Sequence, residues 1–143
     1  MSIQAREQLC DRLIFQRDSQ RSDLMDPDMT NTDLIALMLD VTKNVYWEVT
    51  AVRSDHHDDS GLGLHSHANG YCLDGWPLNS KTAGDYMDPD SLSFEAALRF
   101  ARNSSWLYQI GLAGTADTEP NREAAGPTVF SDSGADHVHL GAH

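Results

Sequence analysis

The chain has 143 residues, which suits one domain with a single modest core. Its hydrophobic content of 40% and charged content of 22% are ordinary for a soluble globular protein. The net charge of −12 argues against nucleic acid and membrane surfaces as partners, because both are anionic and would repel the chain. Any anionic substrate must therefore be recognised by a shaped site.

The first 18 residues contain no apolar run as long as a signal peptide or a membrane-spanning helix requires. The two cysteines, Cys10 and Cys72, lie at unrelated positions, so we expect no disulfide framework and a reducing compartment. Cys72 stands between Tyr71 and Leu73, where a small apolar side chain is expected to be buried.

In the first part of the chain, apolar residues over 3–16 are spaced as in a short amphipathic helix. A polar connection is predicted to follow over 17–33. Apolar residues then recur at helical spacing over 33–44, with Asn31 or Thr32 as a candidate N-cap.

The rest of the chain alternates strands, loops and one further helix. Residues 45–52 are rich in β-branched and aromatic side chains and predict a strand, and 71–76 predict a short strand that ends at Pro77. The clearest helix is 91–103, and 114–127 is expected to be a loop. Three further strands are predicted: 105–113, 128–132 and 137–142. Helices that precede and interrupt short strands indicate a single α+β domain.

Two stretches concentrate histidine and aspartate, HSHANGYCLDGW at 65–76 and DHVH at 136–139. Neutral imidazole and carboxylate are good zinc ligands, and a catalytic zinc needs three protein ligands and an open position. Asp74 lies in an apolar predicted strand, where an unpaired carboxylate would be costly. A bound cation would resolve that conflict.

Sharing one ion between His67 and Asp74 requires the chain to fold back, because a fully extended link would span roughly 23 Å. Asn69 and Gly70 are a plausible place for this reversal, since both tolerate positive φ. The second stretch supplies a third ligand.

On a regular strand, His137 and His139 point to one face and Asp136 to the other, which favours a two-histidine arrangement. The same holds for His65 and His67. Cooperation between Asp136 and His139 instead requires the aspartate to lie on the loop before the strand becomes regular.

HSHANGYCLD resembles the motif Ser-x-His-x-x-Gly-x-Ala-x-Asp of the zinc peptidases that cut peptidoglycan, which include D-alanyl-D-alanine carboxypeptidases, dipeptidases and phage L-alanyl-D-glutamate endolysins. The match falls on His67, Gly70 and Asp74. The departures are His65, where the family usually has serine, and Cys72, where it usually has alanine.

The family's downstream Glu/Asp-x-x-His matches DHVH, with Asp136 in the general-base position, His139 as a ligand and His137 between them. Upstream, TAVRS resembles a family strand that ends in Gly-Tyr-Arg-Ser, at Arg53 and Ser54 but without the Gly-Tyr. The resemblance runs from about residue 32 to the end.

The resemblance implies a Hedgehog/DD-peptidase-like fold, with a short antiparallel sheet flanked by helices. Residues 1–31 would form an N-terminal helix and connection, and 32–143 the zinc peptidase-like domain. The implied substrate is a peptidoglycan stem peptide, cut by an endolysin or a carboxypeptidase. The chain would reside in the host cytoplasm before release, or in a virion, and act on the cell wall.

The resemblance also implies roles for single residues. One zinc ion would be held by three ligands: His67, Asp74 and His139. Asp136 would accept the proton of the attacking water, Arg53 would hold an oxyanion or a substrate carboxylate, and His137 would add a hydrogen bond. Trp76 and Tyr71 would shape the cleft.

Two other interpretations remain open. The imperfect motif is compatible with a non-catalytic, metal-stabilised domain that binds the cell wall or has a structural role. A cupin-like barrel would explain HSH, but the glutamate of that motif is missing from 68–73 and the helices fit it poorly. The tract DHHDD at 55–59 resembles a metal-binding run, and we expect it to be a solvated acidic loop.

Overall fold

The computed structural model describes residues 2–143 and confirms a single α+β domain. Its helices are α1 (Ile3–Asp11), α2 (Asp18–Met25), α3 (Thr32–Val41), α4 (Leu92–Arg102) and α5 (Glu119–Ala125). Its strands are β1 (Leu13–Phe15), β2 (Tyr46–Ala51), β3 (Cys72–Leu78), β4 (Leu107–Ala113), β5 (Val129–Ser131) and β6 (His137–Ala142). Within the described range, no helix is long and apolar enough to cross a membrane.

The strands form one six-stranded sheet in the order β1-β2-β3-β6-β4-β5. The four central strands are antiparallel, as predicted, whereas the edge strands β1 and β5 pair in parallel with β2 and β4. The sheet is therefore mixed. A parallel pair requires a crossover connection, and helices lie in both: α2 and α3 between β1 and β2, and α5 between β4 and β5.

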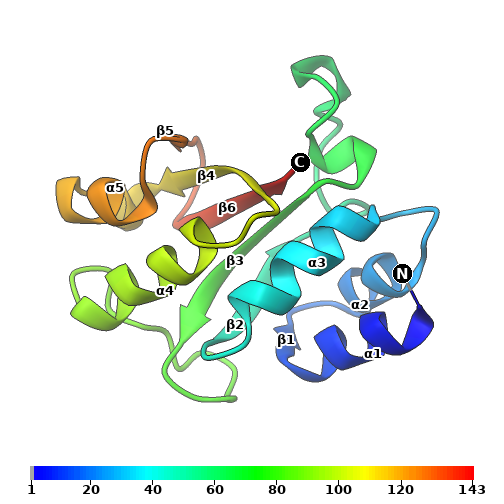
Figure 1. Ribbon diagram of the computed structural model, residues 1–143, viewed down its shortest axis with the longest axis horizontal. Helices are drawn as coiled ribbons and strands as arrows, with labels where there is room; N and C mark the ends of the chain where they lie inside the picture. The colour runs from blue at the N-terminus through cyan, green and yellow to red at the C-terminus, as the bar shows by residue number, and fades with distance from the viewer. Residues whose placement is uncertain (1) are drawn as a thin grey trace.

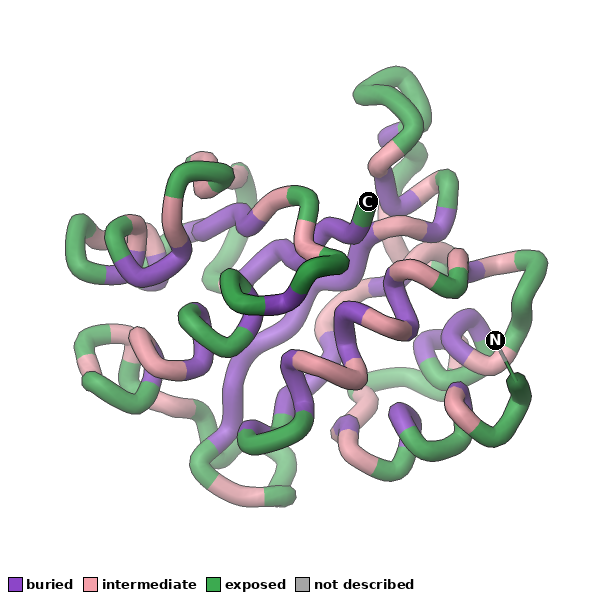
Figure 2. The backbone as a smooth tube through the Cα atoms, in the orientation of Figure 1, coloured by how far each residue is buried: buried purple, intermediate pink, exposed green. Residues whose placement is uncertain are grey.

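The two helices with the clearest apolar spacing form as predicted. The Asn31 side chain caps α3 by accepting from the backbone N–H of Asp33 at 2.9 Å, and Ser91 caps α4 by accepting from Phe94 at 3.1 Å. Both helices pack their apolar sides on the same face of the sheet (Figure 1). Figure 2 shows the central strands buried beneath them.

The predicted strand over 71–76 does not end at Pro77, because β3 continues through Pro77, which pairs with Trp47, to Leu78. The structure also differs from the sequence prediction at three short elements. The predicted helix over 3–16 ends at Asp11, and its last residues form β1. The predicted polar connection contains α2, and the predicted loop over 114–127 contains α5. All three are too short or too polar to show an apolar period, so packing rather than local pattern stabilises them.

Residues 2–31 join the same hydrophobic core as the rest of the chain, through Leu9, Leu13 and Leu24. The Arg6 side chain is 2% exposed and donates to Leu24 O at 2.7 Å, to Thr30 Oγ1 at 2.8 Å and to Thr30 O at 2.9 Å. This buried guanidinium therefore fixes the connection between α2 and α3.

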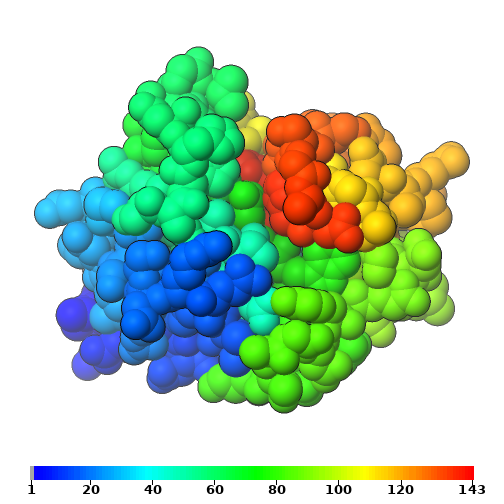
Figure 3. All heavy atoms as spheres, turned by 180° about the vertical axis from the view of Figure 1, so that it is seen from behind, coloured from blue at the N-terminus to red at the C-terminus, as the bar shows by residue number. Residues whose placement is uncertain are grey.

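The two faces of the sheet differ in chemistry because side chains alternate along each strand. Leu73, Val138 and Leu140 enter the core beneath the helices. Asp74 and His139 lie directly opposite one another on β3 and β6 and project from the other face. Figure 3 shows that face, which is hollowed between the green segment near residue 60 and the red-orange segment near residue 132.

Candidate metal centre

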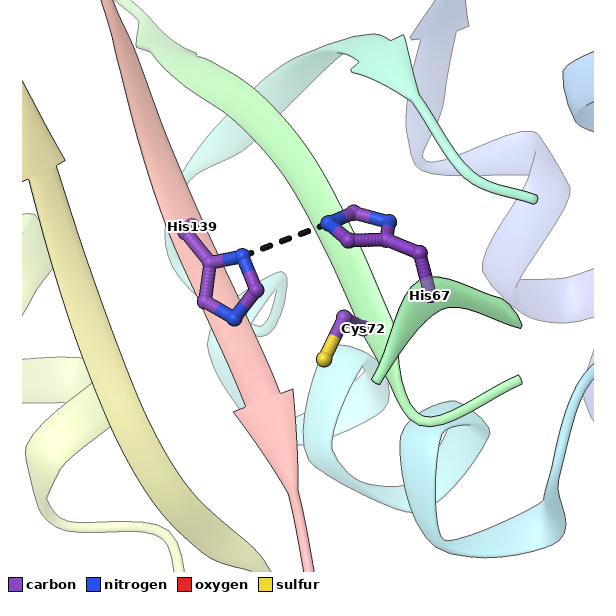
Figure 4. Close-up of side chains that lie close together, drawn as sticks. All are labelled: His67, Cys72 and His139. Carbon is purple, nitrogen blue, oxygen red and sulfur yellow. Dashed lines mark hydrogen bonds between the residues drawn. The ribbon is translucent and has the colours of Figure 1, made fainter. Parts of the chain in front are cut away.

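Three side chains from distant parts of the sequence meet on this face and form what we call the three-ligand centre: His67, Asp74 and His139. Asp74 Oδ1 lies 3.2 Å from His67 Nε2 and 3.2 Å from His139 Nδ1, and these two ring nitrogens lie 3.2 Å apart. Figure 4 shows His67 and His139 pointing toward one another, from a short turn and from β6. These are the residues that the sequence predicted as metal ligands.

Their spacing matches the dimensions of a tetrahedral zinc site. Ligands bound at 2.0–2.1 Å with tetrahedral angles are separated from one another by about 3.3 Å. The three separations in the centre are all 3.2 Å. An ion therefore fits among these atoms with movements of about a tenth of an ångström, by the same geometry.

The hydrogen bonds around the centre leave Asp74 Oδ1 without a partner, while His67 Nε2 and His139 Nδ1 pair with one another at 3.2 Å. His67 Nδ1 lies 2.6 Å from Val52 O, and a carbonyl can only accept, so Nδ1 carries a proton and Nε2 faces Asp74. Asp74 is 6% exposed, and its Oδ1 has no hydrogen-bond partner. A buried carboxylate oxygen without a partner is costly, and a bound cation would relieve that cost.

The charges of the centre depend on one another. Burial alone would raise the pKa of Asp74, but the neighbouring His139 and His67 rings hold it far below its usual range. Burial likewise favours neutral His67, yet the carboxylate of Asp74 raises the pKa of that imidazole above its usual value. The carboxylate thus stays ionised beside the two rings, and the negative charge favours a cation at this position.

The turn that carries His67 is built as the sequence predicted. Gly70 has φ of 79°, in the left-handed region, and a Cβ there would lie 2.5 Å from Met29 O. The carboxylate of Asp59 accepts from the backbone N–H groups of His67 at 3.0 Å and of Ala68 at 2.7 Å. The turn is thus fixed from both sides.

Cys72 lies beside the centre and completes one group of side chains able to hold a metal, with His67 and His139 (Figure 4). Its side chain is fully buried, as expected, and burial raises the pKa of the thiol well above its usual range. The Sγ donates to His65 O at 3.3 Å. These properties describe a protonated thiol that packs against the ligands.

Two residues that the sequence analysis did not select also face the centre. His56 stacks on His67 with ring centroids 3.7 Å apart, and its Nε2 lies 3.6 Å from Asp74 Oδ2. Asp132 Oδ2 lies 2.8 Å from His137 Nε2 and 4.0 Å from His139 Nδ1. The adjacent histidines of DHHDD were the signal for His56, whereas no motif marked Asp132.

The tract DHHDD is thus only partly a solvated loop. His57 and Asp58 are exposed, but Asp59 is buried and His56 contacts the centre. The prediction rested on the charge of the tract. In the structure, Asp59 of the tract supports the turn that carries His67 by accepting from its backbone N–H.

The centre opens into a cavity of about 360 Å³ on the face shown in Figure 3. Besides the three ligands, its walls include His56, His65, Tyr108, Phe130, Asp132 and His137. The three side chains of the centre are therefore buried and yet within reach of a molecule that enters the cavity.

The structure does not bring Asp136 to the centre. Its carboxylate is exposed and accepts from the backbone N–H of Thr115 at 2.9 Å and from Thr115 Oγ1 at 2.8 Å. Strand β6 begins at His137, so alternation turns Asp136 away from the side occupied by His139. The loop placement that a general base would need is not adopted.

Arg53 also lies outside the centre. Its guanidinium donates to Met29 O at 2.9 Å and to Asp28 O at 3.2 Å, and the residue lines a different cavity from the three ligands. Its side chain binds the connection before α3 rather than facing a substrate site.

The predicted cleft residues are separated as well. Trp76 donates its ring N–H to Met87 O at 2.9 Å and lines, with Asp136, a second cavity of about 360 Å³. Tyr71 packs edge-on against His65, with ring centroids 5.1 Å apart. Of the predicted non-ligand residues, only His137 faces the cavity of the centre, 3.9 Å from Asp74 Oδ2.

Replacing Asp23 by alanine should lower the free energy of unfolding by about 3 kcal/mol and weaken metal binding. Its carboxylate is 3% exposed and accepts from the backbone of Arg53 at 3.1 Å and of Ser54 at 2.8 Å. This fixes the chain next to Val52, whose carbonyl orients His67. Urea denaturation and zinc titration measure both effects.

Glu7→Gln is the matched control, because Glu7 is an exposed acidic side chain of the same N-terminal region. It should leave the free energy of unfolding and the affinity for zinc unchanged. Equal stability of Asp23→Ala and Glu7→Gln would contradict the supporting role of Asp23.

The metal-free protein should lose stability as the pH rises from 6.5 to about 9. The hydrogen bond to Asp132 raises the pKa of His137 from 6.5 to about 9, against the opposing effect of burial. Because the pKa of His137 is higher in the folded state than in the unfolded state, its protonation stabilises the folded protein. This contribution is complete below pH 6.5 and is lost as the pH rises through about 9. Denaturation in the presence of chelator across this pH range should show that the free energy of unfolding falls less steeply for His137→Gln than for the wild-type protein. An equally steep fall in both would contradict the pairing of His137 with Asp132.

Comparisons with protein-family models, with curated proteins and with solved structures give no match.

Proposed function

We propose that this chain is a zinc-dependent hydrolase that cuts amide bonds in peptidoglycan stem peptides, with a fold of the Hedgehog/DD-peptidase kind. The observation that carries the proposal is the three-ligand centre. Asp74 Oδ1 is buried without a hydrogen-bond partner, 3.2 Å from one nitrogen of each of His67 and His139. The motif in which these residues occur supplies the substrate class.

The donor set supports zinc and a catalytic rather than a structural site. Structural zinc sites are closed by four protein ligands, usually with cysteine thiolates, whereas catalytic sites use three ligands and leave a position open. Two imidazoles and one carboxylate face a cavity here, and the nearby Cys72 keeps its proton. A zinc ion bound there supplies the Lewis acidity that polarises a carbonyl and activates water.

The surrounding side chains hold this arrangement and limit access by water. The Val52 carbonyl orients His67 by accepting from its Nδ1. The Gln109 amide Nε2–H donates to His139 Nε2 at 3.1 Å, and Phe130 packs edge-on against the same ring. In place of Asp136, the acidic side chain that faces the centre from the C-terminal loop is Asp132.

A specific observation favours the alternative of a non-catalytic, metal-stabilised domain. Asp136 and Arg53, which the resemblance makes catalytic, bond to Thr115 and to backbone carbonyls away from the centre. A domain that uses the ion only for stability has no need of them.

The test is zinc-dependent release of amino groups from purified peptidoglycan. Chelator-treated protein should be inactive, and added zinc should restore release. Bound zinc without release from any peptidoglycan type would overturn the hydrolase proposal and favour the non-catalytic alternative.

A further inference from the structure

The second carboxylate oxygen of Asp74 faces a different set of atoms from the first. Asp74 Oδ2 lies 3.6 Å from His56 Nε2 and 3.9 Å from His137 Nε2. Both separations exceed hydrogen-bonding distance. The two oxygens of one buried carboxylate therefore each face ring nitrogens to which they do not bond.

The tautomers of these rings are fixed by backbone carbonyls. His56 Nδ1 lies 2.8 Å from His57 O, and His137 Nδ1 lies 2.8 Å from Ala135 O. Because a carbonyl oxygen only accepts, both Nδ1 atoms carry protons. His56 Nε2 faces Asp74, whereas His137 Nε2 donates to Asp132 Oδ2 at 2.8 Å, so a metal bound at that nitrogen would displace its proton. His67 has the same arrangement, with its Nδ1 on Val52 O. A backbone carbonyl on the outer nitrogen is the usual support of a metal-binding histidine.

From this geometry we propose a second divalent metal site, formed by Asp74 Oδ2, Asp132 Oδ2 and His137 Nε2, with His56 beside it. These three residues form a group whose ligand atoms all lie within 4.8 Å of one another. Asp74 then bridges two ions, one in the three-ligand centre and one in the second site. The inference goes beyond the single ion of the proposed function and does not require hydrolysis.

An ion with ligands at about 2.1 Å has neighbouring ligands about 3.0 Å apart at right angles and 3.4 Å apart at tetrahedral angles, so these side chains would have to shift by about half an ångström to hold it. His137 Nε2 lies 2.8 Å from Asp132 Oδ2 and 3.9 Å from Asp74 Oδ2, on either side of that range. Two carboxylates and an imidazole suit zinc or manganese.

Two ions held on either side of one carboxylate would form a two-metal site, a type found in hydrolases with ions about 3.5–4 Å apart. Each oxygen of the carboxylate faces its own pair of histidines: His67 and His139 for Oδ1, His56 and His137 for Oδ2. Six of the seven histidines line this cavity, and four of them face the two oxygens of this one carboxylate.

The test is the number of zinc ions per chain, measured by elemental analysis after dialysis against buffered zinc. The wild-type protein should hold two ions. Asp132→Asn and His137→Ala should each hold one, and His67→Ala should also hold one. Asp136→Asn is the matched control, because its carboxylate is exposed and outside both sites, and it should hold two.

One ion in the wild-type protein at saturating zinc would overturn the second site, as would unchanged counts in both Asp132→Asn and His137→Ala. Circular dichroism checks that each variant folds. If His137→Ala does not fold, the zinc count of the near-isosteric Asp132→Asn variant decides the test. Two ions without peptide hydrolysis would reject the proposed function alone. Hydrolysis with one ion would reject the second site alone.

Discussion

Zinc added to the chelator-treated protein should raise its melting temperature by about 10 °C, and the Asp74→Asn variant should lose most of this gain. A ligand present at 100 times its Kd stabilises the folded state by about 2.7 kcal/mol. For a chain of 143 residues this corresponds to roughly 3–4 °C per kcal/mol. The change from aspartate to asparagine keeps the shape of the side chain and removes the anionic ligand.

Asp136→Asn is the control for this thermal measurement, because the same chemical change is made at an exposed carboxylate outside the centre. Its gain should equal that of the wild-type protein. A gain in Asp74→Asn as large as in the wild type would mean that zinc binds somewhere else.

Replacing His139 by alanine should reduce zinc-dependent peptide release at least about 1,000-fold. Loss of a residue that merely supports a metal ligand typically costs 10–100-fold, and loss of the ligand itself should cost more. His67→Ala should behave in the same way. Amino-group release from peptidoglycan at fixed free zinc gives the rates.

Asp136→Asn separates two mechanisms in the same assay. The sequence motif makes Asp136 the general base, so its loss would abolish release while zinc stays bound. The structure leads us to expect activity within about threefold of the wild type, since this carboxylate bonds to Thr115 and does not face the centre. An inactive, zinc-loaded Asp136→Asn would show that the loop rearranges to bring Asp136 to the substrate.

The ligands and the main elements could be predicted from the sequence because each leaves a local signal. Apolar spacing marked α3 and α4, and β-branched residues marked β2. Asp74 was conspicuous as a carboxylate within an apolar strand, and Asn69-Gly70 marked the reversal that brings His67 back to it.

Other features depend on contacts that no local pattern encodes. The α2 helix is stabilised by side-chain hydrogen bonds, such as the one that the backbone N–H of Gln16 donates to Gln20 Oε1 at 2.9 Å. Strand β1 is defined only by its pairing with β2. Asp132 reaches the centre from the loop before β6, a position that tertiary structure alone decides.

Asp136 illustrates how one residue of register changes a chemical role. Both a loop and a strand were possible for the residue that precedes His137, and they place its carboxylate on different sides of the sheet. Asp136 lies in the bend just before β6, and Thr115 offers two hydrogen bonds that hold its carboxylate on the far side. The sequence motif gives no information on this competition.

The most direct measurement is an anomalous difference map at the zinc absorption edge, from crystals grown with zinc. We predict a peak about 2.0–2.2 Å from His67 Nε2, Asp74 Oδ1 and His139 Nδ1. The absence of a peak among these three atoms, in crystals that hold zinc elsewhere on the chain, would contradict the metal centre.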